Sequence, residues 1–244
     1  MTMYKGKTVT CVVPARMSSS RFPGKPLVKI HGRELVLRVA DIAKEAKHVD
    51  RVIVATEDQV IKDLVDSQGY EGWITGSHYT CTHRVAEVSS HLECDYIFNL
   101  QGDEPLVIPS MIDDIIEWGI NHDSDMVQPY RKTTKSEYDD PDSVNMIINN
   151  GRFVHLQREP DTITDNLVSQ IGMYFYKRSV IADFPNLDMT WVEHWKGLDT
   201  IGFVGAYHID AMYIPYHGHL QGVDRPQHVE IVEKIYNTPT KLYV

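Results

Sequence analysis

Apolar and polar residues follow two periodicities along the first half of the chain. Runs that are short, apolar and β-branched, as buried strands are, occur at residues 8–14, 51–56 and 96–100, and a shorter one at 73–75. Segments with apolar residues every three or four positions, as in amphipathic helices, occur at residues 34–47, 58–67, 82–91 and 109–118. Asp58 and Pro109 stand where such helices begin, as a candidate N-cap and a first-turn proline. Strand and helix therefore alternate, which predicts right-handed βαβ units on a parallel sheet.

The second half of the chain is less regular. Strand-like stretches occur at residues 125–132, 144–157, 172–177 and 208–215, and a closing helix at 229–236. The turn Asn149-Asn150-Gly151 divides the second stretch and predicts a hairpin. We interpret residues 1–244 as a single domain, with residues 126–205 as a small appended lobe.

Composition and charge narrow the choice of partners. The formal net charge is −10, which argues against binding of nucleic acid, because that requires a basic surface. The longest apolar runs are too short to span a bilayer, and the first residues lack a signal core, so we expect a cytoplasmic protein without a membrane partner. Cys11, Cys81 and Cys94 are odd in number and lack metal-type spacing, which favours reduced thiols.

The loop at residues 16–26 gathers positive charge directly after a strand. Arg16, Arg21 and Lys25 lie among serines, prolines and one glycine, so backbone N–H groups and cations can approach a phosphate chain together. They could neutralise a triphosphate and a departing pyrophosphate. A solvated basic loop is the alternative, but the Gly24-Lys25-Pro26 segment fixes a geometry that such a loop does not need. The P-loop spacing is absent.

Two acidic turns are the candidate metal ligands. Gln101-Gly102-Asp103-Glu104-Pro105 follows the strand at 96–100, so Asp103 can hold Mg²⁺ while Gln101 can pair with a base or ribose. Asp224 lies in Gly222-Val223-Asp224-Arg225-Pro226, ahead of the last helix. Each aspartate could instead cap the helix that follows it. The loops after strands should meet at one edge of the sheet, where ligands of such folds bind.

Taken together, these motifs resemble the CMP-Kdo synthetases (3-deoxy-manno-octulosonate cytidylyltransferases). The matching strings are P-A-R-x-x-S-S-R-F-P-G-K-P-L, L-Q-G-D-E-P-L and G-V-D-R-P, in the same order over nearly the whole chain. The resemblance implies a Rossmann-like, mixed but mostly parallel α/β sheet flanked by helices, of the nucleotide-diphospho-sugar transferase type. It also implies Mg²⁺ as cofactor, CTP and a small acid as substrates, and a homodimer formed through the appended lobe.

The resemblance further assigns roles to individual residues. The residues implied to bind the nucleotide are Ala15, Arg16, Ser20, Arg21, Lys25, Thr82, Arg84 and Gln101. Asp103 and Asp224 are implied to hold magnesium, and Arg16, Lys25 and Asp103 to be catalytic. The residues implied to contact the acceptor are Arg158, Gln170, Tyr174, Glu193 and Asp199.

The chain also departs from the family pattern. Cys81 and His83 replace a glycine and an aspartate in the implied base loop, and Gln170 and Asp199 replace a histidine and an arginine near the implied acceptor. The loss of an anion-binding arginine should change the preferred acceptor. An acid that bears an amine, a phosphonate or a phosphate would suit the altered pocket, with Asp199 or Glu193 as partner for an amine.

We therefore expect CMP transfer from CTP to a small acidic acceptor, with release of pyrophosphate. Two other interpretations stay open. Transfer from another nucleotide, such as UTP, would be revealed by nucleotide competition. A non-catalytic nucleotide-binding protein on the same scaffold would bind CTP tightly and release no pyrophosphate with any acceptor.

Overall fold

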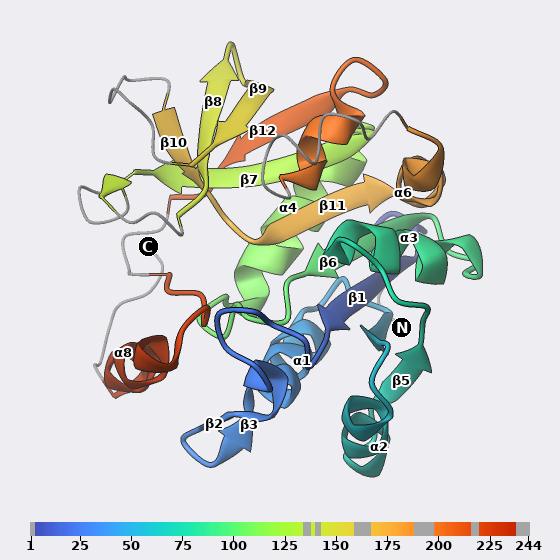
Figure 1. Ribbon diagram of the computed structural model, residues 1–244. Coiled ribbons are helices and arrows are strands. Elements are labelled where there is room, and N and C mark those ends of the chain that lie inside the picture. Colours follow the sequence, from blue (N-terminus) through green and yellow to red (C-terminus); the bar gives the residue numbers. More distant parts are fainter. Residues whose placement is uncertain are drawn as a thin grey trace.

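The computed structural model describes residues 3–133, 138–139, 143–158, 167–187, 198–215 and 220–237 (Figure 1). Its N-terminal half is a parallel sheet in the strand order β5-β4-β1-β6. The strands are Val9–Ala15 (β1), Arg51–Thr56 (β4), Glu71–Ile74 (β5) and Tyr96–Leu100 (β6). All seven residues of β1 are buried, because helices cover both faces of the sheet at this central strand.

Two hydrophobic cores lie on opposite faces of the sheet. One face is covered by Leu35–Glu45 (α1), Gln59–Ser67 (α2), Pro109–Asn121 (α4) and Pro226–Tyr236 (α8). The other face is covered by Cys81–Ser90 (α3) and Arg178–Ala182 (α6). The structure therefore confirms the α/β class, with a sheet between two helical layers.

The second half extends the same sheet with mostly antiparallel pairings. Its strands are Met126–Lys132 (β7), Asn145–Asn149 (β8), Arg152–Gln157 (β9), Leu167–Gln170 (β10), Met173–Lys177 (β11) and Ile209–Tyr213 (β12). β11 joins β6 to β7, and β7 then pairs with β12 on one side and with β10 on the other. Since β10, β8, β9 and β12 also pair in that order, β7 and these four strands close into a ring.

Most of the predicted elements are present, with ends shifted by a few residues. The hairpin at Asn149-Asn150-Gly151 is confirmed: Asn150 and Gly151 have φ of 50° and 73°, as the tight turn between β8 and β9 requires. The sequence did not reveal β10, α6, the short hairpin Lys29–Ile30 (β2) and Arg33–Glu34 (β3), or the 3₁₀ turns Phe184–Asn186 (η2) and Asp199–Phe203 (η3). The division into a single domain with a lobe at 126–205 stays a prediction.

The prediction that Asp58 takes the N-cap position of α2 is confirmed, but its side chain has a different partner. Asp58 occupies the position before α2, but its side chain makes no cap hydrogen bond. Its Oδ2 instead accepts from the backbone N–H of Met17 at 2.7 Å. The carboxylate thus ties the loop after β1 to the loop after β4, which helps to fix the edge of the sheet.

The closing helix α8 packs back onto the N-terminal half of the chain. Glu233 accepts from the backbone N–H of His31 at 2.9 Å, the Tyr236 hydroxyl donates to the carbonyl of Pro105, and the Arg38 guanidinium lies over the Tyr236 ring. These contacts hold the segment before α8 beside the carboxyl ends of β1 and β6. In the described part of the chain, no helix has both the length and the apolar character needed to cross a membrane.

Candidate active site

A cavity of about 740 Å³ opens at the carboxyl ends of β1 and β6. Its walls come from the loop after β1, the start of α3, the loop after β6, the ring strands and the segment before α8. The lining residues are Pro14, Ala15, Arg16, Ser19, Ser20, Arg21, Lys25, Pro26, Tyr79, Thr80, Cys81, Arg84, Gln101, Gly102, Asp103, Glu104, Arg131, Ser143, Val144, Arg158, Ser169, Gln170, Gly172, Tyr174, Leu220, Gln221, Gly222 and Asp224. The two unusual loops predicted from the sequence therefore do meet on one edge of the sheet.

The loop at residues 16–25 is folded tightly on itself. The carbonyl of Met17 accepts hydrogen bonds from the N–H groups of Ser19 and Gly24, at 2.9 and 3.0 Å. Gly24 has φ of 76°, a left-handed conformation that favours glycine, and the 3₁₀ turn Lys25–Leu27 (η1) begins directly after it. This geometry fixes the backbone at Lys25, as expected for an ordered binding loop.

Asp103 and Asp224 converge on one cation although 121 positions separate them. The Lys25 Nζ lies 2.5 Å from Asp103 Oδ2 and 3.7 Å from Asp224 Oδ1. Arg21 Nη2 lies 2.6 Å from the same Asp224 oxygen. Burial works against the charge of Lys25, but the two aspartates outweigh it and raise the pKa of Lys25. The ammonium shows that both carboxylates can face a single cation at this point.

Neither aspartate caps the helix that follows it. Ile108 holds the N-cap position of α4 and Arg225 that of α8, and neither helix has a side-chain cap. The alternative interpretation of both acidic turns as helix caps is therefore wrong. The backbone joins the two turns directly, because Val223 N–H donates to the carbonyl of Asp103 at 2.8 Å.

Glu104 is a third carboxyl group beside this pair, and the sequence motifs assigned it no role. Two glycines make room for it: a Cβ on Gly172 would lie 2.4 Å from Glu104 Oε1, and one on Gly222 would lie 3.5 Å from it. Burial, helped by the charges of Asp103 and Asp224, raises the pKa of Glu104 to about 8. The motif contained the residue, but only the fold reveals how close Gly172 and Gly222 come.

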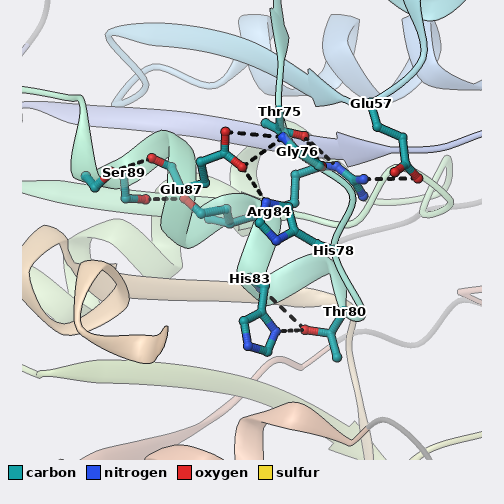
Figure 2. A network of polar contacts seen from close by, with 11 residues as sticks. Glu57, Thr75, Gly76, His78, Thr80, His83, Arg84, Glu87 and Ser89 are labelled. Carbon is teal, nitrogen blue, oxygen red and sulfur yellow. Dashed lines mark hydrogen bonds and ion pairs between the residues drawn. The ribbon is translucent and has the colours of Figure 1, made fainter. Parts of the chain in front are cut away.

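A polar network shapes the cavity wall at the start of α3 (Figure 2). Arg84 is only 1% exposed; its Nε donates to Thr75 Oγ1 at 3.0 Å and its Nη2 lies 3.3 Å from Glu57 Oε1. Burial lowers the pKa of Arg84, although Glu57 works against this. Arg84 thus joins the ends of β4 and β5 to α3. Thr82, also 1% exposed, lies outside the cavity lining.

Glu87 of α3 holds the loop that precedes this helix. It accepts from the N–H of Gly76 at 3.0 Å and pairs with the ring of His78 (Figure 2). The carbonyl of His78 in turn accepts from Arg16 Nη1 at 3.3 Å. Although burial opposes it, these bonds lower the pKa of Glu87. The loop after β1 and the loop before α3 are therefore linked through His78.

The two residues at the start of α3 that depart from the family pattern, Cys81 and His83, have distinct surroundings. His83 lies next to the cap of α3: its Nδ1 lies 2.9 Å from Thr80 Oγ1, and its ring packs edge-on against Phe184 at 4.8 Å between centroids. Figure 2 shows the His83 ring turned toward Thr80. Cys81 lines the cavity as the first residue of α3. The replacement at position 83 therefore serves the helix cap, and the one at position 81 faces the ligand space.

The far end of the cavity is built by the ring strands. Gln170 Nε2 donates to the Tyr174 hydroxyl at 2.7 Å and to Gln128 Oε1 at 3.2 Å. Arg158 lines this end, as does Arg131, which is 6% exposed and donates to the carbonyl of Leu220 at 3.3 Å. Arg131 was not predicted, because its strand shows no binding motif.

Comparison with known proteins gives the family. Residues 10–194 match the cytidylyltransferase family. This chain is a cytidylyltransferase. It is 34% identical over 213 residues to the 3-deoxy-manno-octulosonate cytidylyltransferase of Syntrophotalea carbinolica, covering 80% of this chain and 85% of that one. It is 32% identical over 206 residues to the 8-amino-3,8-dideoxy-manno-octulosonate cytidylyltransferase of Shewanella amazonensis, covering 79% and 84%.

Solved structures agree with the cytidylyltransferase assignment. A CMP-2-keto-3-deoxy-manno-octonic acid synthetase in complex with CTP superposes with a TM-score of 0.85 at 26% identity, over 94% of this chain and 98% of that one. The 4-diphosphocytidyl-2C-methyl-D-erythritol synthase of Anaerococcus prevotii, at 12% identity and a TM-score of 0.65 over 96% and 100%, shares the fold. The predicted family and nucleotidyltransferase fold are confirmed.

The cavity brings together most of the site residues predicted for this cytidylyltransferase. Ala15, Gln101 and all the charged residues proposed around the phosphates and the metal line it, as do Arg158, Gln170 and Tyr174. Gln101 donates to Asn99 Oδ1 at 3.2 Å. Glu193 lies outside the described residues, as does the side chain of Asp199 in η3. The roles of individual residues stay predictions.

Proposed function

We propose that this cytidylyltransferase transfers CMP from CTP to a sugar acid of the 3-deoxy-octulosonate class and releases pyrophosphate. The observation that carries the proposal is the meeting of Asp103 and Asp224 around one ammonium, inside a cavity that Arg16, Arg21 and Lys25 also line. Relatives named for two such acceptors and a related structure with CTP support the substrate class.

The two aspartates fit a magnesium ion. Mg²⁺ favours one or two carboxylates, with phosphate oxygens and water as its other ligands, and here two half-buried carboxylates face one cationic group. Asp103 and Asp224 would hold the ion, which would supply positive charge at the α-phosphate and the acceptor oxygen. Glu104 lies beside them, and in the metal-free protein burial raises its pKa to about 8.

The transfer itself exchanges one P–O bond for another. The acceptor oxygen bonds to the α-phosphorus while the bond from that phosphorus to the β-phosphate bridging oxygen breaks. Pyrophosphate leaves with the electron pair, and the acceptor hydroxyl gives its proton to solvent. Arg16, Arg21 and Lys25 line the cavity where they can neutralise the departing charge. The tight loop that carries them contributes by holding these groups in place before reaction.

An amine-bearing sugar acid is the second candidate acceptor. The relative from Shewanella amazonensis is named for an 8-amino substrate, while that from Syntrophotalea carbinolica is named for the parent acid. At the ring end of the cavity, Gln170 and Tyr174 present a hydrogen-bonded amide and hydroxyl. A neutral pair of this kind can accept from either a hydroxyl or an ammonium, so the pair suits both acceptors.

We also propose a cytoplasmic homodimer formed through the ring strands. Val154 of β9 and Tyr213 of β12 are 45% and 39% exposed there, so the ring offers apolar surface to a second copy. Sedimentation equilibrium at micromolar concentration should give twice the chain mass, and a monomer would contradict this part of the proposal.

Release of pyrophosphate tests the reaction directly. We expect turnover with CTP and with one or both octulosonates, much less with UTP, and none without an acid acceptor. Asp103→Asn should lower kcat at least about 100-fold, because one lost charge-stabilising ligand costs that much in comparable sites. The matched control is Asp63→Asn on the exposed face of α2, which should keep full activity. Tight CTP binding without pyrophosphate from any acid would overturn the proposal.

A further inference from the structure

The carboxylate pair of the proposed metal site already has cationic partners within the chain. Lys25 reaches both Asp103 and Asp224, and Arg21 pairs with Asp224. The side chains of Lys25, Asp103 and Asp224 are only 15%, 27% and 25% exposed, so water screens these charges less than on an open surface. Two cations and two carboxylates therefore form an electrically balanced group without any metal ion.

A divalent ion cannot simply be added to this group. The ammonium of Lys25 lies at hydrogen-bonding distance from Asp103 and within 4 Å of Asp224, where an ion bound by both would also have to lie. The ion would have to displace the ammonium, and a nearby cation would then repel it. Free metal should thus bind these aspartates more weakly than a pair of carboxylates without a lysine would.

A polyphosphate provides the displaced cations with new partners. Lys25, Arg21 and Arg16 line one cavity. The Lys25 side chain can therefore turn from the aspartates toward a ligand in that cavity, while the backbone of η1, which begins at Lys25, stays in place. A triphosphate carries more negative charge than the ion carries positive charge. The nucleotide can therefore hold Lys25 and Arg21 while the ion takes the aspartates.

We propose that Lys25 is a resident counter-cation of Asp103 and Asp224, so that these residues bind a divalent ion only together with the nucleotide. The proposal rests on the metal site given under Proposed function and adds its order of assembly. It explains why a lysine lies between two carboxylates that face a ligand cavity rather than the hydrophobic core. It assigns Lys25 two partners in turn, the carboxylate pair before binding and the phosphate chain afterwards.

Binding of Mn²⁺, followed by the loss of its free-ion paramagnetic resonance signal, tests the proposal without turnover. Wild-type protein without nucleotide should bind Mn²⁺ weakly, and Mn²⁺ with CTP tightly. Lys25→Met should bind Mn²⁺ alone at least about tenfold more tightly than wild type, because one nearby unit charge is removed. Lys25→Gln, which keeps a polar side chain, should do the same, and circular dichroism checks that both variants fold. The matched control is Lys29→Met, four positions along and 62% exposed beside Glu34, which should bind like wild type.

Two aspartate variants separate this proposal from the metal assignment itself. Asp103→Asn and Asp224→Asn should each weaken binding of Mn²⁺ in the presence of CTP. If they do so while both Lys25 variants bind free Mn²⁺ no better than wild type, the counter-cation proposal is overturned and the metal site stands. If neither aspartate variant changes Mn²⁺ binding with CTP, the metal site fails and this proposal fails with it.

Discussion

At the scale of single residues, Glu104 lies where its neutral form is favoured. The glycines at 172 and 222 let its carboxyl group approach the backbone, and burial, then Asp103 and Asp224, raise its pKa to about 8. The charges of Lys25 and Arg131 oppose this shift without cancelling it. A protonated carboxyl group beside two ionised ones limits the repulsion within the cluster, which explains how three acidic residues can share this corner of the cavity.

We expect this carboxyl group to make stability depend on pH. In metal-free protein, folded Glu104 binds its proton up to about pH 8, whereas in the unfolded chain it releases it near its ordinary value of 4.5. Its contribution to stability is therefore complete below pH 4.5 and is lost as the pH rises toward 8. Glu104→Gln does not titrate, so between pH 4.5 and 8.5 its free energy of unfolding should rise by about 4 kcal/mol relative to that of the wild type. Urea unfolding in EDTA at both pH values measures the gain, and a difference that stays constant with pH would refute the expectation.

At the scale of elements, the loops after β1 and β6 are pressed together at their starting points. A Cβ on Gly102 would lie 2.6 Å from the backbone oxygen of Pro14, a distance that real side chains do not reach. The strands themselves pair in parallel register through Val12 and Asn99 just before these loops. The absence of a side chain at Gly102 thus sets the distance between the loop at residues 16–25 and Asp103.

Gly102→Ala should therefore separate the two loops. Because the obstacle is backbone, the loops must move, and overpacking of this kind costs about 1–3 kcal/mol of unfolding free energy. Activity should fall by more than stability implies, since Lys25 and Asp103 move relative to each other; kcat should drop at least about 100-fold. Gly76→Ala is the matched control, because Gly76 does not line the cavity and its Cβ would have its nearest neighbour at an ordinary 3.6 Å. Equal activity of the two variants, measured by pyrophosphate release, would contradict this account.

The same scale shows what sequence could and could not predict. The ends of β4 and β6 were predicted correctly because both strands are short, mostly apolar segments of a parallel sheet. β10 was missed because two of its four residues, Ser169 and Gln170, are polar side chains that line the cavity. Local motifs gave Lys25, Asp103 and Asp224, but Glu104 and Arg131 owe their surroundings to segments distant in sequence. The local apolar pattern is therefore least informative where side chains line the cavity.

At the scale of the whole molecule, the site depends on contacts between the two ends of the chain. Asp224 is two residues from α8, and α8 is fixed to the N-terminal half by Glu233 on His31 and by Tyr236 on Pro105. Within the cavity, Arg21 and Lys25 reach Asp224 directly. A local unfolding that moves α8 away therefore separates Asp224 from Asp103. Because a ligand that needs both carboxylates binds only the closed form, its binding must oppose that unfolding.

Hydrogen exchange can measure this linkage. If amides of α8 exchange through an opening that destroys the site, ligand at 100 times its dissociation constant should slow their exchange roughly 100-fold. We expect this slowing with CTP and Mg²⁺ together, at Pro226–Tyr236, and much less with either alone because each stabilises only part of the cluster.

The internal control is Gln59–Ser67 (α2), which contributes no residue to the cavity and should change little. Asp224→Asn should abolish most of the effect at α8 while leaving α2 as it was. Uniform slowing of both helices would instead mean that exchange follows global unfolding, and unchanged exchange at α8 would show that the C-terminal segment does not close the site.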